Sequence, residues 1–143
     1  MQRSIRSIFY LPIAIAISLT LWNPAAAAQT PGAGKRIDFN RQIRPILSDT
    51  CFTCHGPDGD SRQANLRLDT KDGGAFEERD GYRIIVPGNS AESRFYQKIG
   101  SKDEAQRMPP VYSGRTLTEK QIDLIKHWID EGAQWETHWA YQA

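Results

Sequence analysis

The sequence predicts a single, mostly helical domain with a loop-rich middle. Three segments with apolar residues at helical spacing, near residues 39–50, 90–99 and 118–131, predict the helices. Residues 56–88, between the first two, are rich in glycine, aspartate, arginine and asparagine and show little periodicity. A chain of 143 residues fits one domain, because domains commonly have about 100–150 residues. We therefore expect one hydrophobic core.

Residues 1–28 have the pattern of a secretory signal peptide. Arg3 and Arg6 supply the positive start, an apolar run of about 15 residues follows over residues 8–22, and the alanines at 25–28 suit cleavage. The alternative, an uncleaved membrane anchor, would need roughly 20 apolar residues to cross a bilayer as a helix. We expect cleavage, a periplasmic or otherwise exported product by a Sec-type route, and no stable membrane insertion afterwards.

Loss of Arg3 and Arg6 with this segment lowers the formal net charge from +1 to −1. No basic patch indicates a nucleic-acid partner. Residues 29–36 contain one proline and two glycines and have nothing to bury, so residues 29–37 are predicted to form a flexible linker. The folded domain is then predicted to span residues 38–143.

Asp38 is a suitable N-cap for the first helix, in which apolar residues recur up to Leu47. Pro45 complicates this prediction, because a proline outside the first turn removes a backbone hydrogen bond and costs about 3 kcal/mol. Two alternatives follow: the helix begins near Gln42, or it is kinked there.

Short apolar pieces at residues 66–68 and 84–86 predict at most two short strands in the loop-rich stretch. A loop this long is unusual unless it packs on something other than protein. Ser90 is the expected cap of the second helix and Gly100 its end.

Thr118 and Gln121 have the spacing of a capping box for the third helix, and Gly132 follows its predicted end. Its apolar stripe consists of Ile122, Ile125, Trp128 and Ile129. The tail after it is expected to dock on the core through Trp135, Trp139 and Tyr141.

The strongest chemical signal is the run Cys51-Phe52-Thr53-Cys54-His55. Two thiols three positions apart, followed directly by an imidazole, are what covalent attachment of a c-type haem requires. Each sulfur adds to one vinyl group, and the imidazole reaches the iron. Both cysteines of the chain lie in this motif. The sequence therefore predicts one covalently bound haem c, attached at Cys51 and Cys54, with His55 as the proximal ligand.

An iron that carries electrons needs a second axial ligand. Met1 belongs to the signal peptide, so Met108 is the only methionine of the mature chain. Pro109 and Pro110 stiffen its loop, and a residue before proline favours an extended backbone. We predict that Met108 is the sixth ligand, in preference to a methionine that merely fills a gap in the core.

His127 and His138 are the rival ligands. His127 projects away from the apolar stripe of its helix and is expected to be solvated, and His138 is expected to bond to backbone in the aromatic tail. A zinc site is disfavoured because these two histidines are too far apart for a His-x₃₋₅-His pair. A redox disulfide is disfavoured because no strand–helix–strand pattern accompanies the cysteines. Surface cations are usually only solvated. Those that could pair with the haem propionates are Arg62, Arg67, Lys71 and Arg83.

From about Phe39 to Tyr141 the chain resembles the planctomycete-type cytochrome c domain. The matching runs, in order, are Ile43-Arg44-Pro45-Ile46-Leu47, the haem motif with Gly56-Pro57, Leu66-Arg67-Leu68-Asp69, Val86-Pro87-Gly88, Arg107-Met108-Pro109-Pro110 and His138-Trp139-Ala140. The resemblance implies a small, mostly helical fold around one haem, with the four site residues in the roles given above. Such domains commonly precede further domains, so a free carrier and a part of a longer protein are both compatible with the resemblance.

These observations favour an exported electron carrier with His/Met-ligated iron, which is not an enzyme and exchanges electrons with an unidentified redox partner protein. One alternative is a haem enzyme or ligand sensor with an open sixth position, where His127 or another group serves the distal side. Another is a docking module for a larger multi-domain partner.

Overall fold

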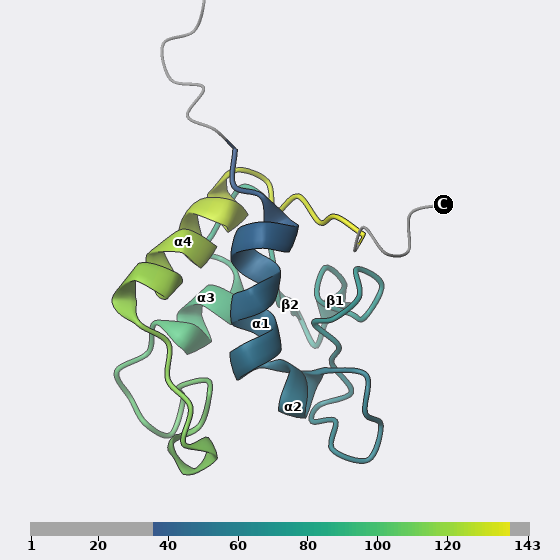
Figure 1. Ribbon diagram of the computed structural model, residues 1–143, viewed down its shortest axis with the longest axis vertical. Coiled ribbons are helices and arrows are strands. Elements are labelled where there is room, and N and C mark those ends of the chain that lie inside the picture. Colours follow the sequence, from purple (N-terminus) through teal and green to yellow (C-terminus); the bar gives the residue numbers. More distant parts are fainter. Residues whose placement is uncertain (1–35, 138–143) are drawn as a thin grey trace, which may run out of the picture. The chain divides into compact units, whose positions relative to one another are not determined.

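The computed structural model describes residues 36–137, drawn as the coloured ribbon in Figure 1. The predicted signal peptide, most of the predicted linker and His138 lie outside the described residues. Within them, four α-helices and one two-stranded sheet agree with the predicted mostly helical class. No helix in this part of the chain is long and apolar enough to cross a membrane.

The first helix begins with a π-helical turn, η1 (Phe39–Ile43), and continues as α1 (Arg44–Thr50). Asp38 caps it as predicted, since its side chain accepts a hydrogen bond of 3.0 Å from a backbone N–H of the first turn. The π-helical turn leaves Pro45 in the first turn of α1, where its missing N–H is tolerated. A change from π to α winding, and not a later start near Gln42, accommodates the proline.

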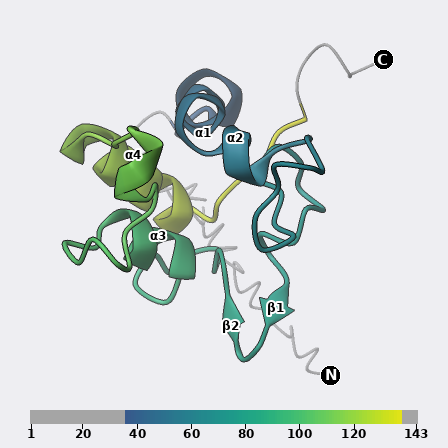
Figure 2. The same cartoon turned by 90° about the horizontal axis from the view of Figure 1, so that it is seen from below.

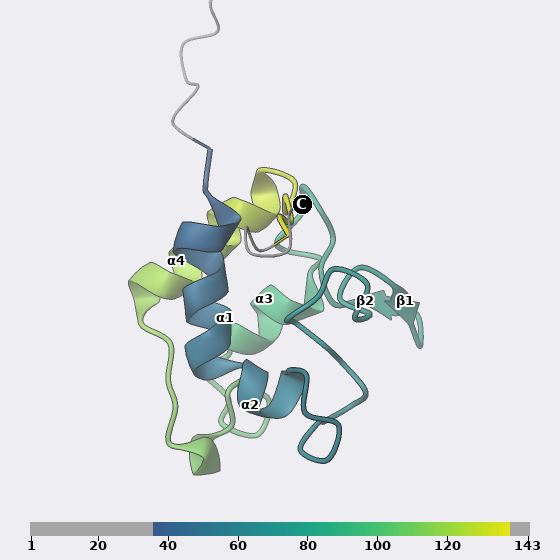
Figure 3. The same ribbon diagram turned by 45° about the vertical axis from the view of Figure 1, so that its right-hand side comes forward.

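A second short helix, α2 (Phe52–His55), follows α1 after a single residue. That residue, Cys51, both ends α1 and precedes the first residue of α2. Figure 3 shows α2 at the end of α1 and at an angle to it. The position of the haem motif is therefore tied directly to the position of α1.

The long loop after α2 contains a hairpin of β1 (Glu78–Arg79) and β2 (Tyr82–Arg83), seen in Figure 2 on the opposite side of the domain from α1. Asp80 and Gly81 form its turn with φ angles of 48° and 80°, the positive values that a two-residue hairpin turn requires. The strands form next to this turn and not at the predicted apolar pieces. Those pieces instead bury Leu66, Leu68 and Ile85 in the core.

The helix α3 (Arg94–Ile99) begins after Ser93, so the predicted cap at Ser90 is wrong by three residues. Ser90 is buried in the preceding turn, and its N–H donates to the Asp130 carboxylate at 2.9 Å. The hydroxyl of Ser93 donates to the Asn89 carbonyl at 2.8 Å. These tertiary contacts hold residues 90–93 in a turn, and the helix ends at Gly100 as predicted.

The longest helix, α4 (Glu119–Asp130), has the predicted capping box between Thr118 and Gln121. Gly132 follows it with a φ of 102°, a left-handed value that suits glycine. The buried face of α4 consists of Ile125, Trp128 and Ile129. His127 is exposed, as its place on the helix predicts.

An aromatic cluster joins the two ends of the domain. The ring of Phe39 lies 5.5 Å from that of Trp128 and 4.3 Å from that of Trp135, between centroids. The indole N–H of Trp128 donates to the Gln134 carbonyl at 2.9 Å, so the buried ring leaves no polar group unsatisfied. The predicted docking of Trp135 is confirmed, while the other two aromatic residues of the tail lie outside the described residues.

Replacing Trp128 by alanine should lower the free energy of unfolding by about 3–5 kcal/mol, because it empties the centre of this cluster. Urea unfolding followed by far-UV circular dichroism measures the loss. Lys120→Ala, on the exposed side of α4, is the matched control and should change it by less than about 0.5 kcal/mol. Equal effects of the two variants would contradict the importance of the cluster.

The Asp130 carboxylate should make folding stability depend on pH at the acidic end. Its hydrogen bond with the Lys126 ammonium, at 2.7 Å, together with the Ser90 N–H, lowers the pKa of Asp130 from 3.8 to about 2. Because the folded pKa is depressed, the stabilisation is present above pH 3.8 and is lost as the pH falls towards 2. The side chain is about one-third exposed, so salt should weaken the effect.

Urea midpoints measured from neutral pH down to acid test this dependence. Asp130→Asn keeps an acceptor for Ser90 but cannot titrate, so the difference in stability between wild type and variant should shrink across this pH range. A difference that stays constant with pH would show that Asp130 does not act through its charge.

Candidate haem-binding site

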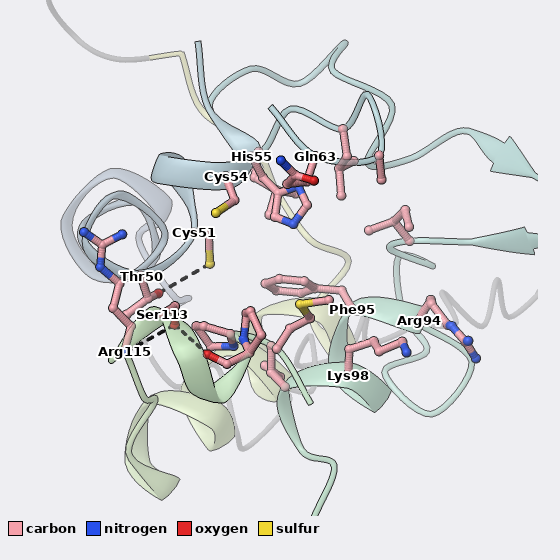
Figure 4. A pocket seen from close by; sticks show the side chains of 18 of the residues that line it. Thr50, Cys51, Cys54, His55, Gln63, Arg94, Phe95, Lys98, Ser113 and Arg115 are labelled. Carbon is pink, nitrogen blue, oxygen red and sulfur yellow. Dashed lines mark hydrogen bonds between the residues drawn. The ribbon is translucent and has the colours of Figure 1, made fainter. Parts of the chain in front are cut away.

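A cavity of about 480 Å³ is lined by residues of α2, α3, the hairpin and the loop before α4. Small-molecule sites commonly have about 300–1,000 Å³. The walls are largely apolar and include Leu66, Leu68, Ile84, Phe95, Ile99 and Pro109. Figure 4 shows this cavity with the motif residues on one side of it. The apolar pieces of the long loop therefore face a space large enough for a cofactor.

The three chemical residues of the motif, Cys51, Cys54 and His55, all line the cavity. They come together because α2 is a single turn, in which the Cys54 and His55 N–H groups donate to the Cys51 carbonyl at 3.1 and 2.8 Å. Both cysteines are free thiols in this structure, Cys51 buried and Cys54 half-buried. One turn of helix thus presents two sulfurs and an imidazole to the same space.

Burial raises the pKa of the Cys51 thiol, and its contact with the Thr50 hydroxyl at 3.4 Å offsets this only in part. The thiol is therefore protonated at neutral pH and protected from unwanted oxidation. Burial lowers the pKa of the His55 imidazole, with the backbone of Gln63 and Leu66 acting in the opposite direction. The imidazole is neutral at pH 7, which is the form that binds a metal.

The two ring nitrogens of His55 have different surroundings. Nδ1 is fully buried, and although the backbone of Gln63 and Leu66 is near, none of residues 36–137 completes a hydrogen bond of normal geometry with it. Nε2 is therefore the nitrogen available to the cavity, into which the ring points in Figure 4. Metal-binding histidines commonly donate their other N–H to a carbonyl, and the Gln63 backbone is suitably placed for this role.

Met108 lines the same cavity from the loop that follows α3. Its N–H donates to the Lys98 carbonyl at 3.0 Å, which ties this loop to the last turn of α3. The residue as a whole is 40% exposed in this structure. The structure thus brings a thioether to the space that also receives the imidazole.

The rival histidines are not placed at this cavity. His127 is exposed on α4 and does not line it, and His138 lies outside the described residues. Between residues 36 and 137, no three His, Cys, Asp or Glu side chains cluster closely enough to hold a metal ion by themselves. The described part of the chain therefore offers no zinc ligand set.

The cations considered from sequence do not reach the cavity. Arg67 is paired with Asp69 at 2.5 Å, and Arg62 donates to the Gly56 carbonyl at 3.1 Å. Three other cations line the cavity: Arg94, Lys98 and Arg115. No sequence pattern marks these three, because their approach depends on how α3 and the loop before α4 fold against α2.

The donor set fits a covalently held haem. Two thiols can form thioether bonds, a neutral imidazole and a thioether are typical axial ligands of haem iron, and the apolar walls match the porphyrin faces. Two of the lining cations, Arg94 and Lys98, suit the two propionate groups.

Cys51 and Cys54 should differ in reactivity in protein produced without haem. Because Cys51 is buried and its pKa is raised, its thiol should be alkylated by iodoacetamide at least several-fold more slowly than the half-buried Cys54 thiol. The single variants Cys51→Ser and Cys54→Ser each leave one thiol, whose reaction rate is read by mass spectrometry. Equal rates in the two folded variants, checked by circular dichroism, would contradict this difference.

Comparison with known proteins gives one match. Residues 51–111 match the family described as Planctomycete cytochrome C. The match begins at the first cysteine of the motif and ends just after Met108, so it covers the whole proposed ligand set. No curated protein and no solved structure matches the chain. The matched residues are fewer than half of the chain; the match supports the resemblance to a planctomycete-type cytochrome c domain, a family that suggests covalently bound haem c.

Proposed function

We propose that this protein is an exported, single-haem c-type cytochrome that carries electrons and transforms no substrate. The observation that supports the proposal most is the convergence of Cys51, Cys54, His55 and Met108 on one largely apolar cavity. These residues come from two segments separated by more than fifty positions, and they include every sulfur atom of the described residues.

Each residue has a distinct part in this function. Cys51 and Cys54 would hold the haem through thioether bonds, and His55 Nε2 and the Met108 sulfur would bind its iron. When bound, the haem would supply one-electron chemistry between the ferrous and ferric states of its iron. A methionine ligand and apolar walls favour the ferrous state, and they also keep water away from the metal.

Export places the protein where haem c is attached and where partner proteins exchange electrons. The proposal of a periplasmic location rests on the signal-like sequence at residues 1–28. The partner is a redox protein, because a six-coordinate haem leaves no position for a substrate.

A second candidate keeps the sixth position open for a small ligand. His127 is not a suitable distal group in this case, since it does not line the cavity. A docking module for a larger partner would use the same haem site.

Met108→Leu separates these candidates, because leucine keeps most of the side-chain volume and removes only the sulfur. Wild-type protein made with c-type maturation machinery should refuse carbon monoxide in the reduced state, and the variant should bind it readily and have a lower reduction potential. Absorption spectra and redox titration measure both effects.

The pyridine haemochrome spectrum is the control, and it should show equal covalent haem in the two proteins. Identical native spectra of wild type and variant would remove Met108 as the ligand. Ready binding of carbon monoxide by the wild type would favour the open site, and a wild type without covalent haem would overturn the whole assignment.

A further inference from the structure

The cations that line the cavity lie on two different sides of it. Figure 4 shows Arg115 on the same side as the Cys51 and Cys54 sulfurs, and Arg94 and Lys98 on the side away from them. Arg94 and Lys98 share one face of α3, four residues apart. The cavity therefore has positive charge at the edge opposite its thiols.

Arg94 is the cation of the three whose hydrogen-bond donors are free. Its guanidinium lies 5.5 Å above the ring of Tyr82, a residue of β2 that also lines the cavity. Within residues 36–137 this stacking is the only interaction of the Arg94 side chain, and none of its guanidinium N–H groups donates to the protein. Lys98 donates to the Gln106 side chain at 2.6 Å, and Arg115 donates to the Thr53 hydroxyl. Stacking on Tyr82 thus orients a guanidinium without using its donors.

The chemistry of haem c assigns a direction to the cofactor. Its two vinyl-derived thioether links are at one edge of the macrocycle, and its two propionate groups are at the opposite edge. Attachment at Cys51 and Cys54 directs the first edge towards α2 and the propionates towards the far side of the cavity. That side is where Arg94 lies, with its guanidinium over the ring of Tyr82.

We propose that Arg94, oriented by Tyr82, binds a haem propionate through paired charge-assisted hydrogen bonds. This inference rests on the proposed covalent haem and extends it to the opposite edge of the cofactor. A guanidinium matches a carboxylate with two parallel N–H donors, which an ammonium such as that of Lys98 does not offer. Through Arg94 and the Tyr82 ring beneath it, α3 and β2 would both help to hold the propionate edge of the haem.

A nearby guanidinium favours the ionised propionate, so its removal should shift the propionate ionisation to higher pH. In the pH dependence of the reduction potential of the haem-loaded protein, Arg94→Gln should move the redox-linked inflection upwards by about one pH unit or more. Arg115→Gln removes an equal charge from the same cavity at the thioether side and should leave the inflection unchanged. Arg94→Lys keeps the charge but not the paired donors, so its inflection should lie between those of wild type and Arg94→Gln.

Resonance Raman bands of the propionates give a second readout and should change in Arg94→Gln but not in Arg115→Gln. The same inflection and the same bands in the two glutamine variants would overturn the inference while leaving the cytochrome assignment intact. If Arg94→Gln does not fold, Arg94→Lys decides the question, since an inflection identical to that of wild type would overturn the paired binding. Absence of covalent haem from the wild type would overturn both proposals.

Discussion

The packing of the first helix against α4 is the constraint on which the site depends. Phe39 is almost fully buried between the rings of Trp128 and Trp135, and this contact fixes the start of the helix that continues as α1. Cys51 ends α1 and precedes α2 without an intervening linker. Any movement of α1 would therefore be passed directly to the thiols and the imidazole, although the aromatic cluster itself contains none of them.

The opposite walls of the cavity are attached to this helix pair by backbone hydrogen bonds. The Gln63 and Leu68 N–H groups donate to the carbonyls of Cys54 and His55 at 2.7 and 2.8 Å, which holds the long loop against α2. The Phe95 N–H donates to the Ile84 carbonyl at 2.8 Å and links α3 to the segment after the hairpin. A loop with little regular structure is thereby ordered, and its apolar side chains face a cavity of cofactor size.

The ionisation states of the groups that line the cavity depend on whether each group is buried or exposed. Burial keeps the Cys51 thiol protonated and the His55 imidazole neutral. A neutral imidazole is the form that binds a metal. The cations remain at the rim, where water offsets the cost of their charge. A haem placed in such a site would have its conjugated faces against apolar side chains and its carboxylates beside Arg94.

Local patterns in the sequence determined much of this protein. The cap at Asp38, the capping box at Thr118 and the apolar face of α4 were predictable because each depends on residues within one or two helical turns. The motif at Cys51 to His55 likewise carries its chemistry in five adjacent positions, and the matching family covers it.

Only the tertiary structure decided the remaining features, because they depend on contacts between distant residues. The start of α3 moved from Ser90 to Ser93 because a carboxylate of α4 binds the Ser90 N–H, forty positions away. The two strands flank the Asp80-Gly81 turn, while the apolar pieces at residues 66–68 and 84–86 contribute buried side chains to the core. The cations at the cavity were not those nearest to the motif in sequence, since Arg94 reaches it only through the packing of α3 and the hairpin around a shared space.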